Sequence, residues 1–279
     1  MSDRRALLRR LLPLVLVLGL AGAWLLPETD ALVLAGDRAA AEGWTAALDE
    51  LPDAATVLVG FDPDLGTYGE IRPTVRTALA DLLARNVRLV VISLTPEGRA
   101  LGLAELARLA RYEANPTRIL DLGYLTGAEA ALAALARQPA VPASASGALA
   151  GRLRDEGIGA VDGVLVIGGN DLGPRTWVEQ LQPRIERVPF LAIAPATLLP
   201  ELQPYVAGGQ LAGLLGTPRD GAAYRATARL GALDRLAEAD APPALPILVG
   251  LLAAIAVLGQ AWLARAGAIV GTQGREGRE

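Results

Sequence analysis

The sequence predicts a three-layer, Rossmann-like α/β domain with a parallel sheet of about five or six strands, flanked by an N-terminal and a C-terminal transmembrane helix. Short runs rich in Val, Ile and Leu alternate with helical segments every roughly 25 to 40 residues, as βαβ units require. Right-handed crossovers assemble such units into a parallel sheet covered on both faces. An uncharged apolar stretch near each terminus predicts the two flanking helices.

The closing apolar stretch, residues 243–264, is long enough for a helix to cross the ~30 Å hydrocarbon core of a bilayer. The opening stretch, residues 11–26, follows a tail that is rich in arginine. Residues 21–23 (AGA) fit signal-peptidase cleavage, whereas Trp24 continues the apolar run and favours an uncleaved anchor. The sequence therefore predicts an anchor here, with a cleaved signal peptide as the alternative.

The distribution of arginine around the two apolar stretches predicts the topology. Arginine is concentrated before the first stretch and after the second, so the positive-inside rule places both termini in the cytoplasm and the α/β domain outside it, at the cell membrane. The expected divisions are a basic cytoplasmic tail at 1–10, a span at 11–26, a linker at 27–36, the domain at 37–240, a span at 243–264 and a polar cytoplasmic tail at 265–279.

The domain is expected to open with a helix, because Asp37 is a favourable N-cap and apolar residues follow at helical spacing up to Pro52. Pro73 and Pro96 suit the first turns of two later helices. Strands are predicted at 56–61, 88–94, 117–121, 161–168, 189–194 and 211–215. Helices are predicted at 37–51, 73–86, 96–112, 127–137, 148–156, 174–187, 196–206 and 224–239.

Several chemistries are excluded by composition. The chain has no His and no Cys, and all 26 of its basic residues are arginine. We therefore expect no zinc, haem or Fe–S centre and no Schiff-base lysine. The net charge of −4 argues against nucleic acid as a partner. The loop at 168–171 (GGND) lacks the G-x-G-x-x-G spacing, so NAD is not expected either.

Ligands of open parallel sheets bind beyond the carboxyl ends of the strands, where the strand order reverses. If the first and fourth strands are neighbours, Asp62 and Asp64 lie close to Asn170 and Asp171. Such oxygen ligands could hold Mg²⁺ or Ca²⁺. Alternatively, these residues are turn and helix-cap residues, because Asp and Asn side chains readily accept backbone N–H groups.

Three more residues at the same edge are candidates for ligand binding. Glu70 follows the first strand, Tyr124 could stack on a ligand, and Arg219 could hold an anion beside a helix N-terminus. The alternatives are packing for the tyrosine and a solvated charge for the arginine.

Four segments carry a resemblance to a known group of proteins: 60–63 (GFDP) with Glu70 and Pro73, 122–124 (LGY), 210–216 (QLAGLLG) and 221–224 (GAAY). The chain resembles an uncharacterised family of membrane-anchored Rossmann-like α/β proteins of unknown function. It departs from that family at Thr217, where the family has a second glycine. The resemblance implies a membrane anchor with one such domain, and it implies no catalytic residue.

Two functions follow as hypotheses. The first is a membrane-tethered binding or scaffold subunit, whose partners are the lipid bilayer and other membrane proteins that contact the transmembrane helices. The second is a carboxylate- and Mg²⁺-dependent hydrolase using Asp62, Asp64 and Asp171, with Arg219 on an anionic substrate. The first is favoured, because without His, Cys or Lys few side chains remain for proton transfer or nucleophilic attack.

Overall fold

The structure is a computed structural model of the chain that describes residues 38–111, 116–185 and 188–234, together with residue 259. Apart from residue 259, the predicted spans, tails and linker lie outside the described residues. Within the described part, no helix combines the length and the apolar character that crossing a membrane requires. The described residues up to 234 belong to one compact unit, Leu34–Ala239.

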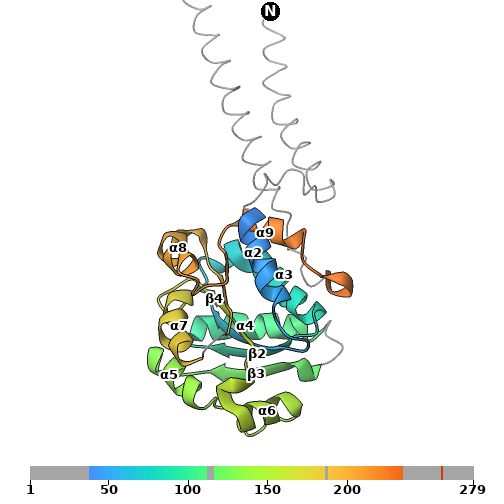
Figure 1. The fold of residues 1–279 in the computed structure, drawn as a ribbon, viewed down its shortest axis with the longest axis vertical. Helices are drawn as coiled ribbons and strands as arrows, with labels where there is room; N and C mark the ends of the chain where they lie inside the picture. Colours follow the sequence, from blue (N-terminus) through green and yellow to red (C-terminus); the bar gives the residue numbers. More distant parts are fainter. Residues whose placement is uncertain (1–37, 112–115, 186–187, 235–258, 260–279) are drawn as a thin grey trace, which may run out of the picture. The chain divides into compact units, whose positions relative to one another are not determined.

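Six parallel strands form one sheet in this unit, in the order β3-β2-β1-β4-β5-β6 (Figure 1). The strands are β1 (Thr56–Asp62), β2 (Arg88–Ser93), β3 (Ile119–Tyr124), β4 (Gly163–Gly168), β5 (Phe190–Ile193) and β6 (Gly213–Leu215). The strand order reverses between β1 and β4, which is the switch point of a Rossmann-like sheet. The predicted parallel α/β fold and its strand number are therefore confirmed.

Helices cover both faces of the sheet, which gives three layers. One face carries α2 (Arg38–Asp49), α3 (Tyr68–Ala84), α4 (Pro96–Leu109) and α9 (Pro218–Arg225). The other carries α5 (Glu129–Arg137), α6 (Ala148–Glu156), α7 (Pro174–Leu181) and α8 (Leu199–Ala207). Short 3-10 turns lie at Pro116–Arg118, Gly157–Ala160, Gln182–Arg184, Ala196–Leu198 and Gly231–Leu233.

The side chains of β1 contribute to the hydrophobic cores on both faces of the sheet. Val57 and Phe61 belong to the core under α2, α3, α4 and α9, while Leu58 belongs to the opposite core, because successive side chains point to opposite faces. Gly60 also faces the second core, where a Cβ atom would lie 2.4 Å from the ring of Trp177. Glycine at this position therefore lets α7 pack directly against the strand.

Several helices differ from the sequence prediction. The helix predicted at 224–239 is interrupted, because α9 ends at Arg225 and residues 226–230 are not helical. Helix α3 begins at Tyr68 and contains Pro73, because the Tyr68 N–H already bonds to the Asp64 carbonyl and starts the helix one turn early. Helix α9 replaces a predicted loop: the Thr217 hydroxyl accepts the Asp220 N–H, and the Asp220 carboxylate accepts the Thr217 N–H. This capping box fixes the helix start.

Candidate functional site

Asp62 lies at the centre of the carboxyl edge of the sheet, as the last residue of β1, and its side chain is fully buried. Its Oδ1 atom accepts the N–H groups of Leu94 at 2.6 Å and Thr95 at 2.9 Å. The Thr95 hydroxyl lies 3.1 Å from the same oxygen and accepts the N–H of Gly98 in the first turn of α4. Asp62 therefore joins the end of β1 to the start of α4.

The second oxygen of Asp62 has a different environment. Oδ2 is buried, and neither this atom nor the buried Nε1 of Trp177 completes a hydrogen bond with a described residue. Burial raises the pKa of Asp62 to about 6, although the N–H groups at Leu94 and Thr95 oppose that rise. Among the groups that lower this pKa, the Trp177 indole has the smallest effect. One oxygen of this carboxylate thus accepts several hydrogen bonds, whereas the other accepts none from a described residue.

Asp64 and Asn170 lie beside Asp62, as the predicted neighbourhood of the first and fourth strands requires. Asp64 accepts the Thr67 N–H at 2.9 Å and the Thr67 hydroxyl at 2.6 Å. The Asn170 amide donates to the Asp62 carbonyl at 3.0 Å, and its own oxygen accepts the N–H of Leu172 at 2.9 Å. Both side chains therefore have the turn and cap contacts that the sequence offered as the alternative to a metal site.

Two more carboxylates bind helix starts at this edge. Glu70 accepts the N–H of Ala196 at 3.0 Å, where the chain turns from β5 towards α8. Asp220 accepts the N–H groups of Gly216 at 3.2 Å and Thr217 at 2.9 Å, at the start of α9. Backbone N–H groups in these positions are the donors that hold phosphates in many domains of this architecture. Here the protein's own carboxylates accept them.

The remaining candidates do not form one site. Tyr124, 42% exposed, ends the edge strand β3, and Arg219 is exposed in the first turn of α9, which follows the opposite edge strand β6 in the chain. Five strand spacings of about 4.8 Å put some 24 Å between these two edges, which is too far for one small ligand. Asp171 is exposed on the loop after β4, and its backbone carbonyl accepts the Thr176 hydroxyl at 2.6 Å.

Metal binding by carboxylates requires several of them to converge. In the described part of the chain, no three acidic side chains gather closely enough to hold a metal ion. Both oxygens of Asp64 and one oxygen of Asp62 are already engaged by donors from the chain. A cation at this edge would therefore have to compete with existing hydrogen bonds.

No protein-family model, curated protein or solved structure matches the chain. The interpretation of the site therefore rests on its own geometry.

The sequence did not reveal the roles of four residues that complete this edge: Thr67, Thr95, Trp177 and Asp220. The two Thr-Pro pairs, at 95–96 and 217–218, are typical of an N-cap followed by proline at the first helical position. The position of Trp177 under β1 had no local signal, since it depends on the packing of α7 against Gly60.

Proposed function

We propose that this protein is a membrane-tethered α/β domain that acts as a non-catalytic binding or scaffold subunit of a membrane assembly. Residues 11–26 and 243–264 span the membrane, both termini are cytoplasmic, and the domain lies outside the cytoplasm. The length of these apolar stretches and the distribution of arginine around them support this arrangement. A reporter fused after Glu279 that is active only outside the cytoplasm would contradict the topology.

The observation that carries the proposal is that carboxylates of the chain occupy the helix starts at the carboxyl edge. Asp62 accepts N–H groups before α4, Glu70 before α8, and Asp220 before α9. An anionic ligand at any of these starts would have to displace a negatively charged side chain that is already bound. This arrangement favours a domain in which the chain's own carboxylates stabilise the carboxyl edge of the sheet, and in which other parts of the surface contact partner proteins.

A second candidate function is a Mg²⁺-dependent hydrolase with Asp62, Asp64 and Asp171 as ligands or base and Arg219 on an anionic substrate. One observation favours it: a buried carboxylate at the switch point has a pKa raised to about 6 by desolvation and keeps one oxygen free. Strongly perturbed carboxylates of this kind are enriched at catalytic sites.

Thermal unfolding of the purified full chain in mild detergent separates the two functions. The melting temperature is measured with Mg²⁺, Ca²⁺ or inorganic phosphate. A ligand at 100 times its Kd stabilises by about 2.7 kcal/mol, which raises Tm by about 5 to 10 °C in a domain of this size. The scaffold proposal expects no such shift. A Mg²⁺ shift that Asp62→Asn abolishes and Glu97→Gln retains would favour the hydrolase instead.

Co-purification tests the scaffold function directly. The full chain is isolated from membranes in mild detergent, and we expect defined membrane proteins to accompany it in fixed proportion. A control chain with residues 37–240 deleted retains both apolar stretches. Proteins captured by the full chain and lost with the deletion are partners of the domain, whereas a full chain that purifies alone would contradict the proposal.

A further inference from the structure

Helix α4 exposes an apolar surface on the side that faces away from the sheet. On its inner side, a Cβ atom on Gly102 would lie 3.4 Å from the ring of Phe61. On its outer side, exposed apolar residues recur at the spacing of three and four that places them in one row, named here the α4 stripe: Ala100, Leu103, Ala104 and Ala107. A surface helix ordinarily has polar or charged residues along its outer side. The α4 stripe therefore has the composition of a surface that is covered.

Two of the three large apolar side chains that are exposed in the described part of the chain lie on the side of the sheet that α4 covers. Leu103 belongs to the α4 stripe and is 47% exposed. Tyr124 is opposite Ser93 in the parallel register of β3 and β2, so both side chains point to one face. Ser93 faces α4, because its hydroxyl oxygen lies 3.7 Å from the position of a Cβ atom on Gly102. Exposed apolar side chains on this side of the sheet therefore extend beyond the small residues of α4.

The two ends of the α4 stripe carry opposite charges. Glu97 is exposed in the first turn of α4, and Arg111 is exposed just after its last turn. Both residues lie seven positions from Ala104, at the middle of the stripe. A second α4 that runs antiparallel, with a two-fold axis at Ala104, therefore places each Glu97 beside the Arg111 of the other copy. The same arrangement packs Leu103 against the alanines of the other stripe, whose small side chains let two helices approach to about 8 Å.

We propose that two copies of this chain pair through the α4 stripe, antiparallel across a two-fold axis at Ala104. A second copy is favoured over another protein because a surface with opposite charges at equal distances from its centre is complementary to itself. The inference rests on the proposed function in one respect, since one pair of helices buries less than the roughly 1,200 Å² of most stable interfaces. Tethering two copies in one membrane raises their effective concentration and compensates for this small area.

Cysteine cross-linking of the full chain in membranes tests this pairing, and the absence of native cysteine removes any background. Ala104→Cys places two thiols at the two-fold axis, so it should form a disulfide between copies. Ala134→Cys, at an exposed alanine of α5 on the other face of the sheet, is the matched control. We expect about ten-fold more disulfide from Ala104→Cys, because the bond requires Cβ atoms within about 4.5 Å of each other. Equal yields from the two variants would overturn the pairing.

Co-expression of two variants tests the antiparallel direction. Position 100 lies eight residues along the paired helices from position 100 of the other copy, which is about 12 Å and too far for a disulfide. It lies within one residue of the point opposite position 107. Ala100→Cys and Ala107→Cys should therefore cross-link with each other far more than either does with itself. Preferential cross-linking of each variant with itself would indicate parallel helices and overturn the proposal.

Charge reversals in the Ala104→Cys chain test the complementarity. Glu97→Arg and Arg111→Glu each bring like charges together at both ends of the stripe, and each should lower the disulfide yield about ten-fold. The two reversals combined should restore the yield. A yield that neither reversal changes would overturn the choice of a second copy as the partner. Co-purification separates this result from the scaffold function: a chain that cross-links but purifies with no other membrane protein would overturn only the scaffold function, and a chain that purifies with such proteins but does not cross-link would overturn only the pairing.

Discussion

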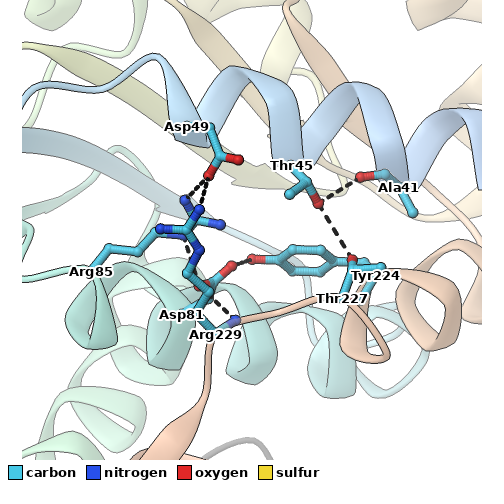
Figure 2. A network of polar contacts seen from close by, with 8 residues as sticks. All are labelled: Ala41, Thr45, Asp49, Asp81, Arg85, Tyr224, Thr227 and Arg229. Atoms are coloured by element: carbon cyan, nitrogen blue, oxygen red, sulfur yellow. Dashed lines mark hydrogen bonds and ion pairs between the residues drawn. The ribbon is translucent and has the colours of Figure 1, made fainter.

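Two buried aspartates of this domain have contrasting environments. Asp62 lies at the carboxyl edge of the sheet, and Asp81 lies in an entry–exit clasp that joins α2, α3 and the segment after α9 through Thr45, Asp49, Asp81, Thr227 and Arg229 (Figure 2). Both aspartates are fully buried. Asp81 has hydrogen-bond donors on both oxygens, and one donor is the Arg85 guanidinium. Asp62 has donors on one oxygen only, all of them uncharged. The difference teaches that a buried carboxylate keeps its charge at lower cost where a cation and a hydroxyl share its two oxygens, and has its pKa raised where uncharged donors support only one oxygen.

The largest expected effect comes from removing the well-paired aspartate. Asp81→Ala leaves the Tyr224 hydroxyl buried without an acceptor and removes one of the two carboxylates that hold Arg85. Breaking a buried pair of this kind costs about 3–5 kcal/mol. Chemical denaturation of the full chain in detergent measures the loss. Glu201→Ala, at an exposed carboxylate on α8, is the control. A loss below about 1 kcal/mol would show that the clasp contributes little to stability.

Asp62 is expected to make stability depend on pH in the opposite sense from most carboxylates. Its pKa is about 6 in the folded protein and 3.8 in the unfolded chain, so the folded state binds the proton more tightly. The stabilisation from protonation is complete below pH 3.8 and is lost as the pH rises through 6, by about 3 kcal/mol in all. Asp62→Asn should flatten this dependence. Unfolding curves measured from pH 4 to 7 that keep the same slope in the variant would contradict the assignment.

Two helix-cap substitutions at the carboxyl edge test whether Thr95 acts on Asp62 as well as on α4. Thr95→Ala removes the cap of α4 and a hydroxyl that donates to Asp62. The loss of a cap costs about 1 kcal/mol, and the loss of the donor moves the Asp62 transition to higher pH. Thr217→Ala removes the equivalent cap of α9, remote from Asp62, and is the matched control. We expect similar destabilisation in the two variants and a shifted pH midpoint only in Thr95→Ala.

The sequence predicted the parts of this molecule that depend on local pattern. The buried strands are mostly runs of Val, Ile and Leu, and the alternation with helices predicts that β1 and β4 are neighbours only if the strand order is the usual one. Asn170 therefore lies beside Asp62 as expected. Helix α9 was missed because Pro218, Asp220 and Gly221 also suit a turn, and only the capping box distinguishes the two.

The contacts that could not be predicted join distant segments. Tyr224 and Asp81 are 143 positions apart, and nothing in the sequence near either residue indicates the other. The same holds for Trp177 and Gly60, whose contact depends on how closely α7 approaches β1. Burial of a specific carboxylate follows from tertiary packing, so the raised pKa of Asp62 could not be derived from the Asp-Pro pair that follows the strand.

The smallest effect is expected at the exposed part of the clasp. The side chain of Arg229 is 64% exposed, and its ion pair with Asp49 is screened by water and salt. Arg229→Ala keeps the backbone N–H that bonds to Asp81, so we expect a loss of at most about 1 kcal/mol in the denaturation measurement used for Asp81→Ala. Equal losses of stability in Arg229→Ala and Asp81→Ala would show that the exposed ion pair, and not the buried Asp81, stabilises the clasp. The donors on Asp81 would then not explain why it differs from Asp62.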